Sequence, residues 1–253
     1  MPLDVEFIAR ERPQNNVVYL PTTGSTMTEA ARLASQGAPH GTLMIAEEQT
    51  AGIGRFGRHW YSEAGLGIYS STILRLPIAS NAVPLVTLAL GLATAEAIEH
   101  TTGLACDLRW PNDVLVNERK VAGILAQLQD GCVIAGIGIN VNQPELPADL
   151  RTPATSLRMV AGRAFSREKL IVALLEALDD FGSMLVDRGA AAILAAFSAA
   201  SSYVLHRRII FEGNDGPRRG ITAGLDANGF LLVNDHTGIS HTVYTGGVRP
   251  DVS

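Results

Sequence analysis

The sequence has 253 residues, of which 47% are hydrophobic and 18% are charged, so a disordered chain is excluded. The net charge of −5 gives no reason to expect a nucleic acid as partner. Two cysteines, Cys106 and Cys132, stand in separate apolar stretches without metal-binding spacing. We therefore expect them to be reduced core residues of a cytoplasmic protein.

No segment of the sequence is typical of a signal peptide or a membrane span. The first twenty residues carry several charges and no apolar run of the length a secretory signal needs. The most apolar long stretch, residues 85–98, is interrupted by Glu96 and is shorter than the roughly 20 residues of a spanning helix. We expect this stretch to belong to a buried helix and expect no membrane partner.

The first two hundred residues alternate between strand and helix patterns. A turn at 21–24 precedes the first helix, where Thr26 and Glu29 have capping-box spacing. Pro111, Asn112 and Asp113 predict a tight turn. The predicted strands are 17–20, 42–49, 67–76, 104–109, 121–128 and 132–140, and the predicted helices are 26–35, 84–100, 167–186 and 190–197.

From about residue 201 the sequence pattern changes to short β-strand-like runs separated by Gly, Asn and Asp. These runs are 208–211, 220–225, 230–233 and 241–244. Several strands within about fifty residues indicate a small barrel. The predicted fold class is α+β, with a mixed central sheet and flanking helices in residues 1–200 and a small β-barrel in residues 201–253.

Residues 52–57 spell the glycine pattern GxGxxG, which is typical of dinucleotide-binding folds. That function requires a helix after the motif and an acidic residue about 20 positions later, and neither follows here. The glycines instead allow the backbone to approach an anion, and Arg55 and Arg58 can bind phosphate or carboxylate oxygens. Trp60 can stack on a planar ligand group. A solvated hairpin tip explains this segment alone equally well.

Two further segments carry polar side chains at the ends of strands. Lys120 follows the run Arg-Trp-Pro-Asn-Asp at 109–113 and opens an apolar strand, where a long amine suits a carboxylate or phosphate. A β-turn and a solvated strand end are the structural alternatives. Glycines alternate with branched residues at 136–142, which indicates close approach by a ligand or another backbone. Asn140 can then hydrogen-bond a sugar or base.

Taken in order, these segments resemble the catalytic domain of biotin protein ligases. Ser25-Thr26 is similar to the family's STN segment, and residues 48–60 resemble its GRGRxGRxW loop. Three more segments resemble KWPND, KxxGIL and GIGINVN, at 109–113, 120–125 and 136–142. The β-rich tail resembles the family's SH3-like C-terminal domain. The resemblance implies the catalytic fold of this family, which is like that of class II synthetases.

The resemblance also implies a reaction and its ligands. Biotin reacts with Mg-ATP to give biotinyl-5′-AMP, and biotin is then transferred to a lysine of the biotin carboxyl carrier protein of acetyl-CoA carboxylase. The implied catalytic residues are Lys120, Arg55 and Arg58. The implied biotin-binding residues are Ser25, Thr26, Met27, Gln49, Ile53, Gly54, Arg55, Lys120 and Gly123. The implied ATP-binding residues are Arg55, Arg58, Trp60, Asn112, Asp113, Lys120 and Asn140, with Asp113 as the candidate Mg²⁺ ligand.

The sequence departs from the family pattern at three positions. Met27 replaces an asparagine, Ile53 replaces the first arginine of the loop, and Arg109 replaces a lysine. Too few residues precede Val17 for a winged-helix domain, so we do not expect repression by that route. A lipoate ligase with the same adenylate chemistry and a non-catalytic biotin-binding module are the alternative functions, and a homodimer is left open.

Overall fold

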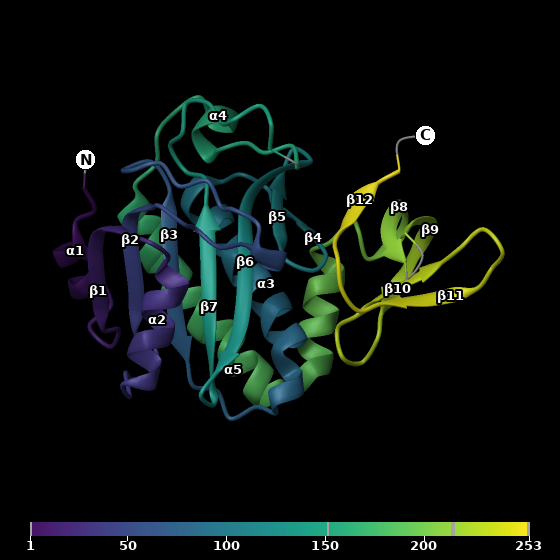
Figure 1. Ribbon diagram of the computed structural model, residues 1–253, viewed down its shortest axis with the longest axis horizontal. Coiled ribbons are helices and arrows are strands. Elements are labelled where there is room, and N and C mark those ends of the chain that lie inside the picture. Colours follow the sequence, from purple (N-terminus) through teal and green to yellow (C-terminus); the bar gives the residue numbers. More distant parts are fainter. Residues whose placement is uncertain (1, 151, 214–215, 252–253) are drawn as a thin grey trace.

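Seven strands of the computed structural model, which describes residues 2–150, 152–213 and 216–251, form one mixed sheet (Figure 1). β1 and β2 run parallel, and every other neighbouring pair in this sheet is antiparallel. Across the sheet the strands are β1 (Val17–Thr23), β2 (Leu43–Gln49), β3 (Ile68–Leu74), β7 (Cys132–Ile139), β6 (Arg119–Gln129), β5 (Asp113–Val116) and β4 (Asp107–Arg109).

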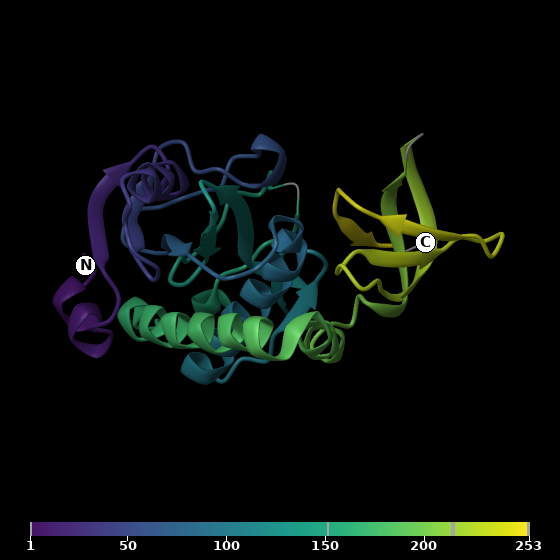
Figure 2. The same ribbon diagram turned by 90° about the horizontal axis from the view of Figure 1, so that it is seen from below.

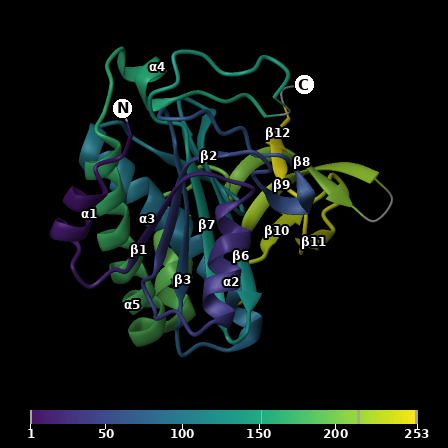
Figure 3. The same cartoon turned by 60° about the vertical axis from the view of Figure 1, so that its left-hand side comes forward.

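Different helices cover the two faces of this sheet (Figure 2). On one face α3 packs against β6 and α5, and on the other α2 packs against β2, β3 and β7. Alternate strand residues face the two sides, so Leu43 and Ile45 pack with α3 and α5, whereas Met44 packs with α2. α1 lies beside α5 (Figure 3). The helices are α1 (Val5–Glu11), α2 (Thr26–Ser35), α3 (Val83–Thr102), α4 (Leu157–Ala161) and α5 (Arg167–Ala199), with short 3₁₀ turns η1 (Arg55–Gly57) and η2 (Ser80–Ala82).

α3 is apolar on all sides, and this explains its place between the sheet and α5. By length and composition alone Ser80–Thr102 could cross a membrane, but 67% of its apolar window is buried within the fold. A helix that is hydrophobic all round is expected in the core of a protein of this size. The prediction that residues 85–98 belong to a buried helix is therefore confirmed.

The C-terminal residues form a separate five-stranded antiparallel sheet. Its strands in spatial order are β11 (Ser240–Val243), β10 (Leu231–Asn234), β9 (Gly216–Leu225), β8 (Leu205–Gly213) and β12 (Val248–Pro250). Phe211 on β8 and His241 on β11 have ring centroids 5.9 Å apart although their strands are not neighbours, so the sheet curls on itself. The predicted fold class is confirmed. α5 ends at Ala199, and the exact boundary between residues 200 and 201 stays a prediction.

The structure corrects several details of the sequence-based elements. β1 continues through Pro21 instead of turning there, because a proline is tolerated on an edge strand. Residue 113 begins β5, a strand that the sequence did not indicate, and Asn117 and Glu118 then turn the chain into β6 with left-handed φ of 50° and 60°. The predicted break between the helices 167–186 and 190–197 is confirmed, because α5 consists of two helical segments that meet at Gly189, whose φ of 73° and ψ of −176° are not helical. The helices α1 and α4 and the strand β12 were also missed.

One buried ion pair connects β2 to the first turn of α5. Arg167 Nη1 lies 2.7 Å from Glu47 Oε2, and the two side chains are only 4% and 9% exposed. The backbone N–H of Leu3 donates to Glu47 Oε1, so the same carboxylate also fixes the segment before α1. Breaking one partner of a buried pair leaves the other charge uncompensated.

We expect Glu47→Gln to lower the free energy of unfolding by about 3–5 kcal/mol, measured by guanidinium denaturation. Glu29→Gln is the matched control, because Glu29 pairs with Arg32 at 3.0 Å on the surface of α2. Loss of that exposed pair should cost less than about 1 kcal/mol. Equal losses in the two variants would contradict the structural role of the buried pair.

Candidate active site

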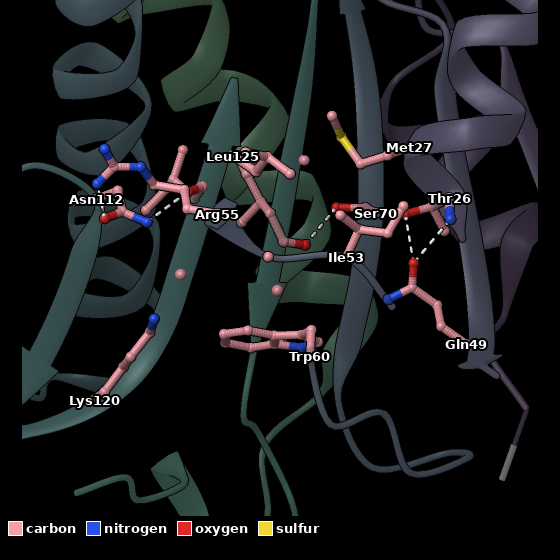
Figure 4. A pocket seen from close by; sticks show the side chains of 16 residues that line it. Thr26, Met27, Gln49, Ile53, Arg55, Trp60, Ser70, Asn112, Lys120 and Leu125 are labelled. Carbon is pink, nitrogen blue, oxygen red and sulfur yellow. Dashed lines mark hydrogen bonds between the residues drawn. The ribbon is translucent and has the colours of Figure 1, made fainter. Parts of the chain in front are cut away.

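A cavity opens on the α2 side of the large sheet, under the loop that follows β2 (Figure 4). It encloses about 440 Å³ of empty space including its mouth. The start of α2, the end of β2 and the middle of β3, β6 and β7 form its walls. The side chains labelled in Figure 4 are Thr26, Met27, Gln49, Ile53, Arg55, Trp60, Ser70, Asn112, Lys120 and Leu125.

Trp60 lies directly against glycines of β6 and β7. A Cβ atom at Gly138 would lie 2.4 Å from Trp60 Cε2, and one at Gly123 would lie 2.7 Å from Trp60 Cζ3. At Gly136 a Cβ atom would lie 2.5 Å from the sulfur of Met27. The contacts with the rigid indole are too short for a Cβ atom, so glycine is needed at 123 and 138, whereas the flexible Met27 side chain can move away from residue 136. The close approach that the glycine pattern predicts is thus made by the chain's own side chains.

The end of the cavity beside α2 is neutral and polar. The backbone N–H and the hydroxyl of Thr26 donate to Gln49 Oε1 at 2.8 and 3.0 Å. Ser71 Oγ donates to Thr26 Oγ1 at 2.9 Å, and Gln49 Nε2 donates to Ser62 Oγ at 3.2 Å. The predicted capping box with Glu29 is therefore wrong, because Ser25 precedes the helix and the Thr26 hydroxyl is committed to Gln49.

The opposite end of the cavity is cationic. Lys120 Nζ lies 2.5 Å from Asp113 Oδ1, and Arg109 Nη2 lies 2.6 Å from Asp113 Oδ2. The Lys120 amine also faces the Trp60 ring, 5.2 Å from its centroid. Burial raises the pKa of Asp113, but the charges of Lys120 and Arg109 outweigh burial, so the pKa lies below its usual value. One ionised carboxylate thus balances two cations, and the cluster keeps a net positive charge.

Arg55 comes to this end of the cavity from the tip of the loop. The loop is a small hairpin in which Gly54 N donates to the Arg58 carbonyl at 2.7 Å. Arg55 Nη1 donates to Asn112 Oδ1 at 3.1 Å and to the Gly246 carbonyl of the C-terminal sheet region at 3.0 Å. Burial lowers the pKa of Arg55, and the charge of Asp113 offsets part of this effect.

The structure brings most of the predicted site residues to one cavity. Those that line it are Thr26, Met27, Gln49, Ile53, Gly54, Arg55, Trp60, Asn112, Lys120 and Gly123. The sequence-based list missed Ser70, Ile124, Leu125 and Ile137 along with Gly136 and Gly138. Alternation could have found Leu125, which shares a face with Gly123, and Gly136 and Gly138, which share a face with each other. It could not have found Ile124 and Ile137, which point to the opposite side of the sheet into the core with α3 and α5.

Four predicted residues stand outside the cavity lining, and their roles stay predictions. Arg58 is exposed and stacks on the outer Phe56 ring, 5.4 Å from its centroid. Asn140 is buried and donates to the Thr155 carbonyl at 3.2 Å. Ser25 is buried just before α2, and the cavity is lined by its neighbour Thr26. Asp113 lies behind Lys120 and Arg109.

The donor set around Asp113 does not fit a resident magnesium ion. Each of its carboxylate oxygens already contacts a cation. Within residues 2–150, 152–213 and 216–251, no three His, Cys, Asp or Glu side chains form a metal-binding group. The metal role predicted for Asp113 therefore has no support in this geometry.

Comparisons with known proteins place this fold and site in a class of enzymes that attach cofactors to proteins. Residues 19–143 match the model of the Biotin/lipoate A/B protein ligase family. The bifunctional ligase/repressor BirA of Bacillus subtilis is 35% identical over 92% of this chain and 74% of its own length. The biotin–[acetyl-CoA-carboxylase] ligase of Mycobacterium tuberculosis is 34% identical over 84% of this chain and 80% of its own.

A solved structure agrees with these relatives. The biotin protein ligase from Aquifex aeolicus, in complex with biotin and ATP, superposes with a TM-score of 0.81 and 31% identity. The match covers 92% of this chain and 97% of that chain. The chain belongs to the biotin protein ligase family.

We expect Gly138→Ala to displace Trp60 from the cavity, because the new methyl group would overlap the indole. The sequence has only two tryptophans, and Trp110 is buried elsewhere, so a change in intrinsic fluorescence reports on Trp60. Gly182→Ala on α5 is the control, because its Cβ would meet only Leu76, at an ordinary 3.7 Å. Unchanged fluorescence in Gly138→Ala would contradict the tight packing of Trp60.

Proposed function

We propose that the chain activates biotin with ATP to form biotinyl-5′-AMP and transfers biotin to a lysine of the carboxyl carrier protein of acetyl-CoA carboxylase. The proposal rests on one observation in a chain of this family: the two ends of the cavity differ in charge. A neutral hydroxyl–amide pair, Thr26 and Gln49, lies at one end, and two cations, Lys120 and Arg55, lie at the other (Figure 4). Biotin has the matching shape, with a neutral ureido ring at one end and a carboxylate at the other.

The walls between the two ends suit the rest of that substrate. Met27, Ile53, Leu125 and the face of Trp60 present apolar surface to the ring sulfur and the aliphatic chain. The neutral end offers hydrogen-bonding groups that are already oriented by each other, so little freedom is lost on binding. The ureido group is therefore expected beside Gln49 and the carboxylate beside Lys120.

The cationic end supplies what the first chemical step requires. The biotin carboxylate attacks the α-phosphorus of ATP, a P–O bond forms, and pyrophosphate leaves. Two anions must approach, and negative charge grows on the phosphoryl oxygens in the transition state. Lys120 and Arg55 offset both effects because the cluster with Asp113 keeps a net positive charge. Magnesium is expected to arrive with the ATP phosphates as part of the substrate.

In the second step the carrier lysine, as a neutral amine, attacks the carbonyl carbon of the mixed anhydride. An amide bond forms, AMP leaves, and one proton is released. Loop residues 51–60 cover the cavity and would shield the anhydride from water. Arg58 would join the phosphate only if the loop moves further inward, because its side chain now lies outside.

We also propose a cytoplasmic location, where ATP and the carrier protein are present. In the part of the chain that the structure describes, both cysteines are free, in keeping with a reducing compartment. A homodimer stays a prediction, which sedimentation equilibrium of the purified chain would test.

The function is tested with ¹⁴C-labelled biotin and lipoate, offered separately with ATP to an apo carrier domain. We expect the carrier domain to be labelled by biotin and not by lipoate. Labelling by lipoate alone would contradict the proposal and would favour a lipoate ligase. Biotin-dependent exchange of pyrophosphate into ATP separates an enzyme from a binding module, because a module that only binds biotin shows none.

We expect Lys120→Ala to lower pyrophosphate exchange by about 10²–10³-fold, as for other transition-state donors. The sequence contains only one other lysine, Lys169, which is exposed on the first turn of α5. Lys169→Ala is therefore the matched control and should retain full exchange. Near-normal turnover of Lys120→Ala would remove that residue from the mechanism.

A further inference from the structure

Arg55 lies at the junction of the two sheets. Its side chain lines the candidate active-site cavity and also a second cavity, which lies between the large sheet and the C-terminal sheet. The second cavity is lined mainly by apolar groups, among them Pro84, Trp110, Phe230 and Tyr244. Arg55, together with Ile124 and Leu125, therefore separates the two cavities, because these residues line both of them.

The C-terminal sheet is docked at this junction by contacts that do not involve Arg55. Trp110 Nε1 donates to the Gly229 carbonyl at 2.9 Å. Gly229 packs so closely on α3 that a Cβ atom there would lie 3.0 Å from Leu88 Cδ1. Ser202 Oγ donates to Asp107 Oδ2 at 2.6 Å at the start of the connection. These contacts make the Gly246 carbonyl an acceptor whose position is fixed relative to the large sheet.

Within the part of the chain that the structure describes, the hydrogen bonds of the Arg55 side chain all go to neutral oxygen atoms. Nη1 donates to the Gly246 carbonyl and to Asn112 Oδ1, and Asn112 is itself anchored by its donation to the Ile124 carbonyl at 2.8 Å. A carboxylate in either place would orient the guanidinium but would also cancel its charge. Carbonyl acceptors orient it and leave its full positive charge for an anionic ligand.

We propose that the Gly246 carbonyl is a positioning group for adenylation, so that the docked C-terminal sheet acts on the reaction through Arg55. This inference rests on the proposed function of the cavity. It makes the C-terminal sheet a part of the catalytic unit, although the Gly246 carbonyl does not line the active-site cavity.

The test compares two glycines of the same small sheet region that have the same backbone strain. Gly246 has φ +88° and Gly238 has φ +83°, so alanine is disfavoured equally at both. A Cβ atom at Gly246 would meet Glu212 Cβ at 3.4 Å, an ordinary van der Waals contact, and nothing lies within 4 Å of one at Gly238, so neither alanine is excluded by a clash. Relief of the strain at residue 246 should shift its own carbonyl away from Arg55, and Gly238→Ala introduces the same strain at a residue that does not contact Arg55.

We expect Gly246→Ala to lower biotin-dependent pyrophosphate exchange by about tenfold to a hundredfold, the range for one hydrogen bond to a charged group. The KM for biotin should rise by a smaller factor than exchange falls, because the groups expected to hold the ureido ring, Thr26 and Gln49, do not involve Arg55. Gly238→Ala should exchange normally. Equal rates in the two variants would overturn the proposal.

A double-mutant cycle tests whether Gly246→Ala lowers pyrophosphate exchange through Arg55. In an Arg55→Lys background, where the two-pronged guanidinium is absent, Gly246→Ala should cost less than about twofold. A loss as large as in the wild-type background would show that Gly246 acts by another route and would overturn the proposal. Trypsin cleavage after Arg55 and Arg58 should also be faster in Gly246→Ala than in Gly238→Ala. This cleavage requires no activity, so it tests the contact even if the proposed function fails.

If Gly246→Ala does not fold, a semisynthetic chain replaces it. An ester in place of the Gly246–Gly247 amide weakens the carbonyl as an acceptor and leaves φ of Gly246 unchanged. The loss of exchange and the faster cleavage of the loop are expected in this chain too. Wild-type rates of both would overturn the proposal.

Discussion

The shared carboxylate of Asp113 is the interaction on which the site depends. Arg109, Asp113 and Lys120 come from three neighbouring strands, β4, β5 and β6, so the pairing of these strands places two cations on one carboxylate. Lys120 would otherwise extend into solvent from the start of β6. Held by Asp113 and by the face of Trp60, its amine stays at the edge of the cavity with few rotamers to lose on binding.

The two ends of the cavity therefore differ in charge before any ligand binds. Its neutral end is built from amide and hydroxyl groups that satisfy each other, and its cationic end carries more positive charge than the local carboxylate can cancel. A ligand with one neutral polar head and one anionic end is accepted in a single orientation, since the reverse would bury an anion against the Gln49 carbonyl oxygen. The glycines of β6 and β7 maintain this arrangement because they alone allow Trp60 to lie flat on the strands.

The parts of the fold that were predictable from sequence are those with a strong local pattern. α3 is apolar on all sides and the glycine alternation of β7 is visible in the chain, so both were expected close to their observed bounds. The predicted turn is present at Pro111 and Asn112, but β5 was hidden because Asp113, also a turn former, pairs instead with β4 and β6. The Thr26–Gln49 contact and the hydrogen bond from Arg55 to Gly246 join residues 23 and 191 positions apart, which no local pattern reports.

The scarcity of lysine on this molecule has a chemical consequence. An acyl adenylate that escapes from the cavity reacts with free amines, whereas guanidinium groups stay protonated and unreactive at neutral pH. The chain has twenty basic residues, yet Lys120 is held by Asp113 and Lys169 is the other lysine. Around its own mouth the cavity thus presents arginines, so the surface is poor in nucleophiles for the reactive product that forms inside. Of the two lysine side chains, only that of Lys169 on α5 is exposed to an intermediate that leaves the cavity.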